Sequence, residues 1–90
     1  MSNKFSTKVA KNIRNILTLD AAETNRRYKI TKCLSFSEQY VRLAEMGLVS
    51  GTVVFVKQKA PLGDPIEITV KGYSLCLRAS DAKNYVIKEL

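Results

Sequence analysis

Most of the chain beyond residue 25 alternates apolar and polar positions with the two-residue period of β-strands. Tyr28 and Ile30, for example, alternate with charged neighbours, and Ile66, Ile68 and Val70 alternate with polar ones. The segment TVVFVKQKA is also rich in β-branched and aromatic residues, which favour strands. The pattern predicts five short strands, at 26–34, 52–60, 66–71, 75–78 and 85–90.

One helix is predicted between the first two of these strands, near residues 37–46. Ser37 is a suitable N-cap, Glu38 falls in the first turn, and Gly47 ends the helix. A loop follows the second strand, because the segment 60–65 contains two prolines and a glycine. Five strands, tight turns and one helix predict a mainly β fold, a small barrel whose closure removes exposed strand edges.

A different period occurs at the N-terminus, where apolar residues recur every three or four positions. These residues are Phe5, Val9, Ile13 and Ile16, and a parallel stripe holds Lys4, Lys8, Lys11 and Arg14. This spacing predicts a short amphipathic helix, which would be marginal in water and needs a surface. Its own barrel, a neighbouring subunit and an anionic membrane surface are the alternatives. We therefore divide the chain into a basic extension, residues 1–15, and a barrel domain, residues 16–90.

The strand 52–60 places two large apolar side chains in an unusual position. If Val54 and Val56 face the core, then alternation makes Val53 and Phe55 face outward. Two such groups in water form an adhesive patch, unless the fold covers this strand on both faces. We expect Val53 and Phe55 to contact a partner, and they also offer a surface to the N-terminal stripe.

Three segments resemble the FeoA family, in the same order and at the same spacing. They are RLAEMGLVSGT at 42–52, APLGDPIEI at 60–68 and LCLR at 75–78. The resemblance covers the chain from about residue 16 to residue 90, and the basic N-terminus is not part of it. It implies that the barrel is SH3-like. It also implies a role beside FeoB, a membrane transporter of ferrous iron with a cytoplasmic GTPase domain.

Length and composition indicate the number of domains and the cellular location of the chain. Its 90 residues suffice for one domain with a modest core. It contains no apolar run long enough to span a bilayer, no secretory signal and only two cysteines, so we expect a cytoplasmic protein.

The net charge of +7 is uneven: residues 1–34 hold eight Lys or Arg against two acidic residues, and residues 35–90 hold seven against six. A nearly neutral body disfavours a nucleic-acid partner.

Nothing in the sequence indicates catalysis or a cofactor. There is no histidine and no phosphate-binding loop of the form G-x-x-x-x-G-K-[ST]. Cys33 and Cys76 are 43 residues apart and lack the spacing of metal ligands, so we expect no metal site. Two other functions stay open: a direct iron carrier that uses these thiols with Asp64 and Glu67, and a DNA-contacting regulator that uses the basic N-terminus.

Protein contact is therefore the expected mode of action. A FeoB-type transporter is the partner that the resemblance implies, a second copy of the chain is a further candidate, and the membrane surface is involved only indirectly. The proline-rich loop presents Leu62 and Asp64, and Tyr73 follows a tight turn. With Val53 and Phe55, these residues are the candidate partner contacts.

Overall fold

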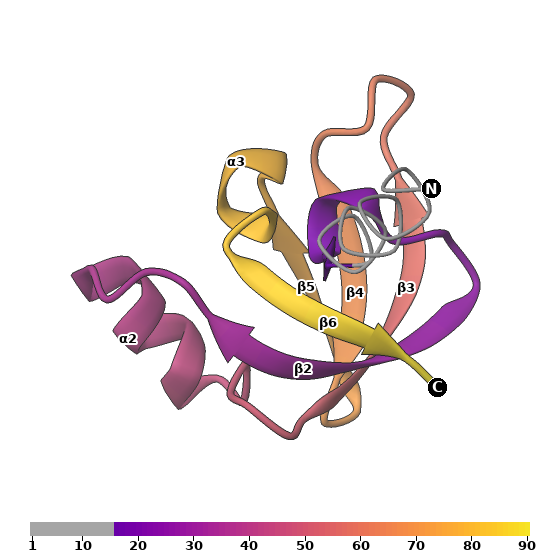
Figure 1. Ribbon diagram of the computed structural model, residues 1–90. Coiled ribbons are helices and arrows are strands. Elements are labelled where there is room, and N and C mark those ends of the chain that lie inside the picture. Colours follow the sequence, from indigo (N-terminus) through magenta and orange to yellow (C-terminus); the bar gives the residue numbers. More distant parts are fainter. Residues whose placement is uncertain (1–15) are drawn as a thin grey trace, which may run out of the picture.

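The computed structural model describes residues 16–90, and β-strands form most of this part (Figure 1). The strands are β1 (Leu17–Thr18), β2 (Arg26–Cys33), β3 (Val53–Lys59), β4 (Ile66–Val70), β5 (Tyr73–Leu77) and β6 (Tyr85–Glu89). The helices are the 3-10 helix η1 (Leu19–Ala21), α2 (Glu38–Glu45) and α3 (Ala79–Ala82). The five predicted strands and the predicted helix are thus confirmed, and α2 follows the first of those strands.

The strands form one antiparallel sheet in the order β1-β6-β2-β3-β4-β5. The sheet is strongly curled, so that β2 and β6 cross in front of β3 and β4 in Figure 1. The sixth strand, β1, was not predicted, because two residues are too short to show alternation. It adds Leu17 and Thr18 to the outer edge of β6.

The inside of the curled sheet is filled by apolar side chains from every strand of residues 26–89. In β4 the burial alternates, with Ile66, Ile68 and Val70 inside. Val54 and Val56 of β3 are fully buried, as alternation predicted. The other buried residues are Leu19, Ala22, Tyr28, Ile30, Tyr40, Leu43, Leu48, Leu77, Ala82, Tyr85 and Ile87.

The helix α2 covers one end of this core. Ser37 occupies the N-cap position in an extended conformation, and Gly47 ends the helix with φ +106°. A Cβ atom at Gly47 would lie 3.1 Å from Cδ of Lys71, so glycine also lets the lysine stem pack there. Tyr40 and Leu43 face inward, and the Tyr40 ring packs against Tyr85 with 5.8 Å between centroids.

Polar contacts join α2 to the segment of α3. The Tyr40 hydroxyl accepts a hydrogen bond from Nδ2 of Asn84 at 2.9 Å and donates one to Oδ1 of Asp81 at 3.3 Å. Nε2 of Gln39 donates to the other oxygen of Asp81 at 2.7 Å. The hydroxyl of Tyr85, by contrast, is buried without a hydrogen-bond partner among residues 16–90.

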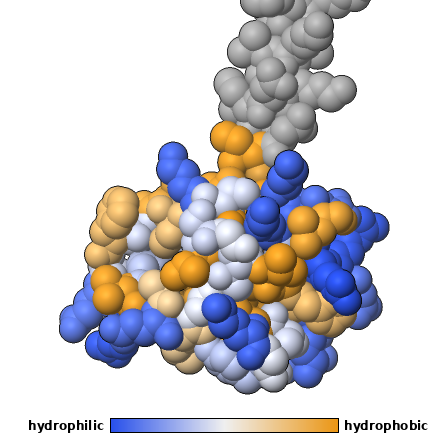
Figure 2. Space-filling model, turned by 90° about the horizontal axis from the view of Figure 1, so that it is seen from below, coloured by the Kyte–Doolittle hydropathy of each residue, from blue (hydrophilic) through white to orange (hydrophobic). Residues whose placement is uncertain are grey.

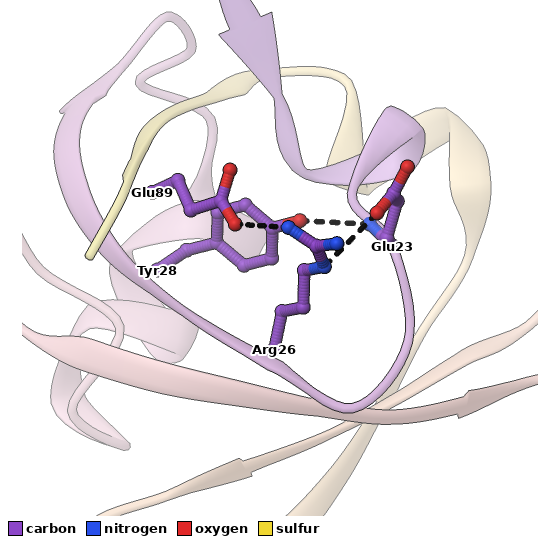
Figure 3. Close-up of polar contacts among 4 residues, drawn as sticks. All are labelled: Glu23, Arg26, Tyr28 and Glu89. Carbon is purple, nitrogen blue, oxygen red and sulfur yellow. Dashed lines mark hydrogen bonds and ion pairs between the residues drawn. The ribbon is translucent and has the colours of Figure 1, made fainter.

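A second polar cluster joins the start of β2 to the end of β6 (Figure 3). Nε of Arg26 lies 3.0 Å from Oε1 of Glu23, and its Nη1 pairs with Glu89 at the end of β6. The Tyr28 hydroxyl accepts a hydrogen bond from the backbone N–H of Glu23 at 2.9 Å. Two carboxylates, one three residues earlier in the chain and one on β6, therefore neutralise Arg26.

We expect Gly72→Val to lower the free energy of unfolding by about 1 kcal/mol or more, because valine tolerates positive φ poorly. Lys71 and Gly72 form the two-residue turn between β4 and β5, with φ of 50° and 87°. Gly63, with φ 83°, should behave in the same way. Urea unfolding measures the loss. Ser74→Val, at an exposed strand position, is the control and should leave stability unchanged. Equal stability of both glycine variants would contradict the turn assignment.

We expect Tyr85→Phe to raise the free energy of unfolding by up to about 1 kcal/mol, because it removes a buried hydroxyl that has no hydrogen-bond partner. We expect Tyr40→Phe to lower the free energy of unfolding by about the same amount, because it removes a hydroxyl that makes two hydrogen bonds.

The two variants should also differ in alkali. Burial raises the pKa of Tyr85 in the folded state. Above the ordinary tyrosine pKa the unfolded chain loses this proton first, so stability falls as pH rises there. Tyr85→Phe should remove part of that fall, which urea titrations at several pH values would detect. A fall of the same size in Tyr85→Phe would contradict this account.

Candidate interaction surfaces

The β3–β4 loop presents the most exposed apolar side chain of this part of the chain, Leu62, whose exposure is 96%. The loop is held by backbone hydrogen bonds: Ala60 N–H donates to the Pro65 carbonyl at 3.0 Å, and Gly63 N–H donates to the Ala60 carbonyl at 2.7 Å. Oδ1 of Asp64 accepts from Ala79 N–H at 2.9 Å and thereby ties the loop to α3. Of the two predicted contacts here, Leu62 is free to meet a partner and Asp64 supports the loop.

Part of the Tyr73 side chain also makes a contact within the fold. It is the first residue of β5 and is exposed, but its hydroxyl donates to the backbone carbonyl of Met46 just beyond α2. The phenol therefore fastens the β4–β5 hairpin to the end of the helix. Only the ring face of Tyr73 is left for a partner.

Val53 and Phe55 lie on the outer face of the sheet, opposite in direction to the buried Val54 and Val56. Val53 is 44% exposed and Phe55 is half-buried. Their neighbours on β2 are Lys29, opposite Val53, and Arg27, opposite Phe55. Residues 16–90 thus do not cover Val53, and two cations lie beside the apolar pair.

A further apolar surface, which the sequence analysis missed, lies where α2 begins. Phe36 is 91% exposed, and it lines a cavity of about 190 Å³ together with Cys33, Ser35, Tyr40, Val41 and Ala44. Phe36 precedes the N-cap and Val41 is the fourth helical residue, which are the positions of a hydrophobic staple. That spacing is visible in the sequence and is the signal that could have found this surface.

The N-terminal stripe is only partly visible. Ile16, directly before β1, is exposed, whereas Phe5, Val9 and Ile13 lie outside the described residues, so docking of the stripe stays a prediction. The cations Arg27 and Lys29 beside Val53 and Phe55 disfavour that face as its site, because the N-terminal segment also carries Lys4, Lys8 and Lys11.

The residues of the iron-carrier alternative are not gathered in one place. Glu67 and Cys76 are cross-strand neighbours on β4 and β5, but Sγ of Cys33 donates to the Ser35 carbonyl at 3.3 Å, and Asp64 binds α3. The Glu67 carboxylate accepts from Gln58 and pairs with Lys57, and both contacts lower its pKa. Within residues 16–90, no group of three or more Cys, Asp or Glu side chains could hold a metal ion.

Across the part of the chain that the structure describes, no helix has the length and apolarity needed to cross a membrane.

Comparison with known proteins assigns the chain to a family. The sequence model of the FeoA domain matches residues 17–88, which is nearly the whole of the described chain. This chain belongs to the FeoA family. The three segments that resemble FeoA lie at the end of α2, in the β3–β4 loop and in β5.

Solved FeoA structures have the same fold. A FeoA-like protein from Clostridium acetobutylicum is 35% identical, with a TM-score of 0.75 over 83% of this chain and 87% of that one. FeoA from Chlorobium tepidum is 31% identical, with a TM-score of 0.77 over 82% and 70%.

FeoA from Stenotrophomonas maltophilia, solved with zinc, is 26% identical, with a TM-score of 0.69 over 80% and 89%. It is described as a prokaryotic SH3 domain protein and is suggested to be a ferrous iron transport activating factor. The SH3-like barrel expected from the sequence is thereby confirmed. A search of curated proteins gave no match.

We expect Cys33→Ser and Cys76→Ser to leave the binding of ferrous iron and zinc unchanged, because the two thiols do not share a site. Anaerobic equilibrium dialysis of the full chain measures this. A stoichiometric site that disappears in either variant would contradict the prediction and revive the iron-carrier alternative.

Proposed function

We propose that this FeoA-family chain is a non-catalytic cytoplasmic accessory protein of a FeoB-type ferrous iron transporter and acts by protein contact. The observation that carries the proposal is the family match over residues 17–88. The suggestion that a related FeoA activates ferrous iron transport supports the same role.

The distribution of apolar side chains supports action by contact. Leu62 and Phe36 are almost fully exposed, although burying such a side chain is worth about 1.5 to 3 kcal/mol. Leu62 lies on the β3–β4 loop and Phe36 beside α2, and these two elements lie at opposite ends of the molecule (Figure 1). Exposed apolar groups held on ordered elements suit protein surfaces that become buried in a complex.

The polar side chains of the described region support the same view. Asp64, Tyr73 and Asp81 each bond to another part of the fold: to Ala79, to Met46, and to Tyr40 with Gln39. These side chains hold loops and helices in place, as expected for a protein that binds a partner through preformed surfaces.

An anaerobic pull-down with the cytoplasmic GTPase domain of a FeoB-type transporter tests the proposal. The full chain should be captured, and Leu62→Ser should reduce capture at least about tenfold, as expected for loss of a buried apolar anchor. Leu90→Ser, which removes another exposed leucine, is the matched control and should bind like the wild type. Unfolding curves of both variants should coincide with that of the wild type.

Deletion of residues 1–15 in the same assay separates the barrel from the basic extension. Capture of the shortened chain assigns the contact to the barrel. Failure of the full chain to bind the GTPase domain, with either GTP or GDP present, would refute the proposed partner.

A further inference from the structure

The outer face of the sheet carries cations in a regular arrangement. We use the term basic sheet face for the outward residues Arg27, Lys29, Lys32, Lys88, Val53 and Phe55. Lys29, for example, lies between the buried residues Tyr28 and Ile30. Beyond the bulge in β2, Lys32 pairs with Val86 of β6. Cross-strand register places Lys88 of β6, Lys29 of β2 and Val53 of β3 side by side. Figure 2 shows that apolar and strongly hydrophilic residues are interleaved on the molecular surface.

The cations of this face are not neutralised within residues 16–90. The ion pairs of this region join Arg26 to Glu23 and Glu89, and Lys57 to Glu67. Arg26 lies between the carboxylates of Glu23 and Glu89 (Figure 3), whereas none of these ion pairs includes the next residue, Arg27. Lys29 and Lys88 are direct cross-strand partners, and like charges in that position destabilise a sheet. Fold stability therefore does not account for this arrangement.

Each of two cations lies beside an apolar side chain on the next strand. Arg27 is opposite Phe55, and Lys29 is opposite Val53. The cation row on β2 and the apolar row on β3 are about 4.8 Å apart, and the residues within each row repeat every 6.7 Å or so. An α-helix advances about 6 Å in four residues. An amphipathic helix that lies along β2 and β3 can match both rows, with Asp or Glu over β2 and apolar residues over β3.

We propose that the basic sheet face docks an acidic amphipathic helix of a partner protein. Carboxylates of that helix offset the repulsion between Lys29 and Lys88, and its apolar stripe covers Val53 and Phe55. The proposal rests on the proposed function in one respect, namely that the chain acts by protein contact.

A lipid surface fits this face less well. Phe55 is half-buried, so only part of its side chain is available to a bilayer. The most exposed apolar side chains, Leu62 and Phe36, belong to other surfaces. The chain's own residues 1–15 also fit poorly, because Lys4, Lys8 and Lys11 repel Arg27 and Lys29.

The test is an NMR titration of the full chain with a synthetic helical peptide of about 18 residues, long enough to be helical. Its Leu and Glu residues form adjacent stripes, and a scrambled peptide of identical composition is the reference. The striped peptide should shift the amide signals of Arg27, Lys29, Val53 and Phe55. Its affinity should fall as salt rises from about 50 to 200 mM, because exposed charges are screened.

Matched variants locate the site. Lys29→Glu should weaken the striped peptide at least about tenfold, whereas Lys83→Glu, the same charge change beyond α3, should leave its affinity unchanged. Val53→Thr keeps the β-branched shape and should weaken binding severalfold. Lys29→Glu also removes the repulsion between Lys29 and Lys88, so the unfolding temperature of this variant should not fall. An unchanged unfolding temperature would show that its weaker binding does not result from loss of folding.

The proposal is overturned by equal affinity of the scrambled peptide, by equal loss in Lys83→Glu, or by amide shifts centred on another surface. Vesicles containing phosphatidylserine are titrated in parallel. If they shift the basic sheet face and the peptide does not, the face binds lipid and the proposal fails. The pull-down with Leu62→Ser is independent of these results, because it tests the contact with the transporter and leaves the basic sheet face unchanged.

Discussion

β2 pairs along both of its edges, with β6 on one side and β3 on the other, and the rest of the structure depends on this double pairing. It holds β2 in the middle of the sheet, where alternation puts Tyr28 and Ile30 into the core and leaves Arg27 and Lys29 outside. Because β6 comes from the end of the chain, this pairing joins residues that are far apart in the sequence. Arg26 adds an ionic link between the same two strands, because it pairs with Glu89 at the end of β6 as well as with Glu23.

The two faces of the curled sheet have different roles: inward residues form the core that stabilises the fold, and outward residues form the surface. Inward positions are aliphatic or aromatic, and none of the buried residues within 16–90 is charged. Charged and polar residues are confined to the outside, where Asp64, Asp81 and Tyr73 secure the loop, the helices and the hairpin. A small domain with little core to spare can in this way hold several separate surfaces in fixed positions.

Local periodicity was sufficient to predict the parts of the fold that obey one rule over several residues. Alternation located β2 to β6, and the N-cap and glycine signals located α2, because each depends on neighbours in the chain. The two residues of β1 and the bulge in β2 between Ile30 and Lys32 depend on pairing with β6, which no local pattern reveals.

The candidate surfaces were predictable to a similar degree. The outward direction of Val53 follows from alternation alone. The cations beside it could not be placed, since the register of β2 against β3 and β6 is a property of the closed sheet. Asp64 was a plausible contact in the sequence, but its bond to Ala79 joins residues 15 positions apart. Phe36 was missed because it lies in a short stretch between two regular elements.

The bond between Asp64 and Ala79 has a thermodynamic consequence for any complex formed at the β3–β4 loop. A loop that becomes ordered only on binding loses conformational entropy at that moment, at a cost of about 1 to 2 kcal/mol per residue. Here the cost has already been met during folding, since the carboxylate and two backbone hydrogen bonds hold the loop before a partner arrives. The loop that carries Leu62 is thus preorganised, and binding a partner there does not lose affinity to the entropy of ordering the loop.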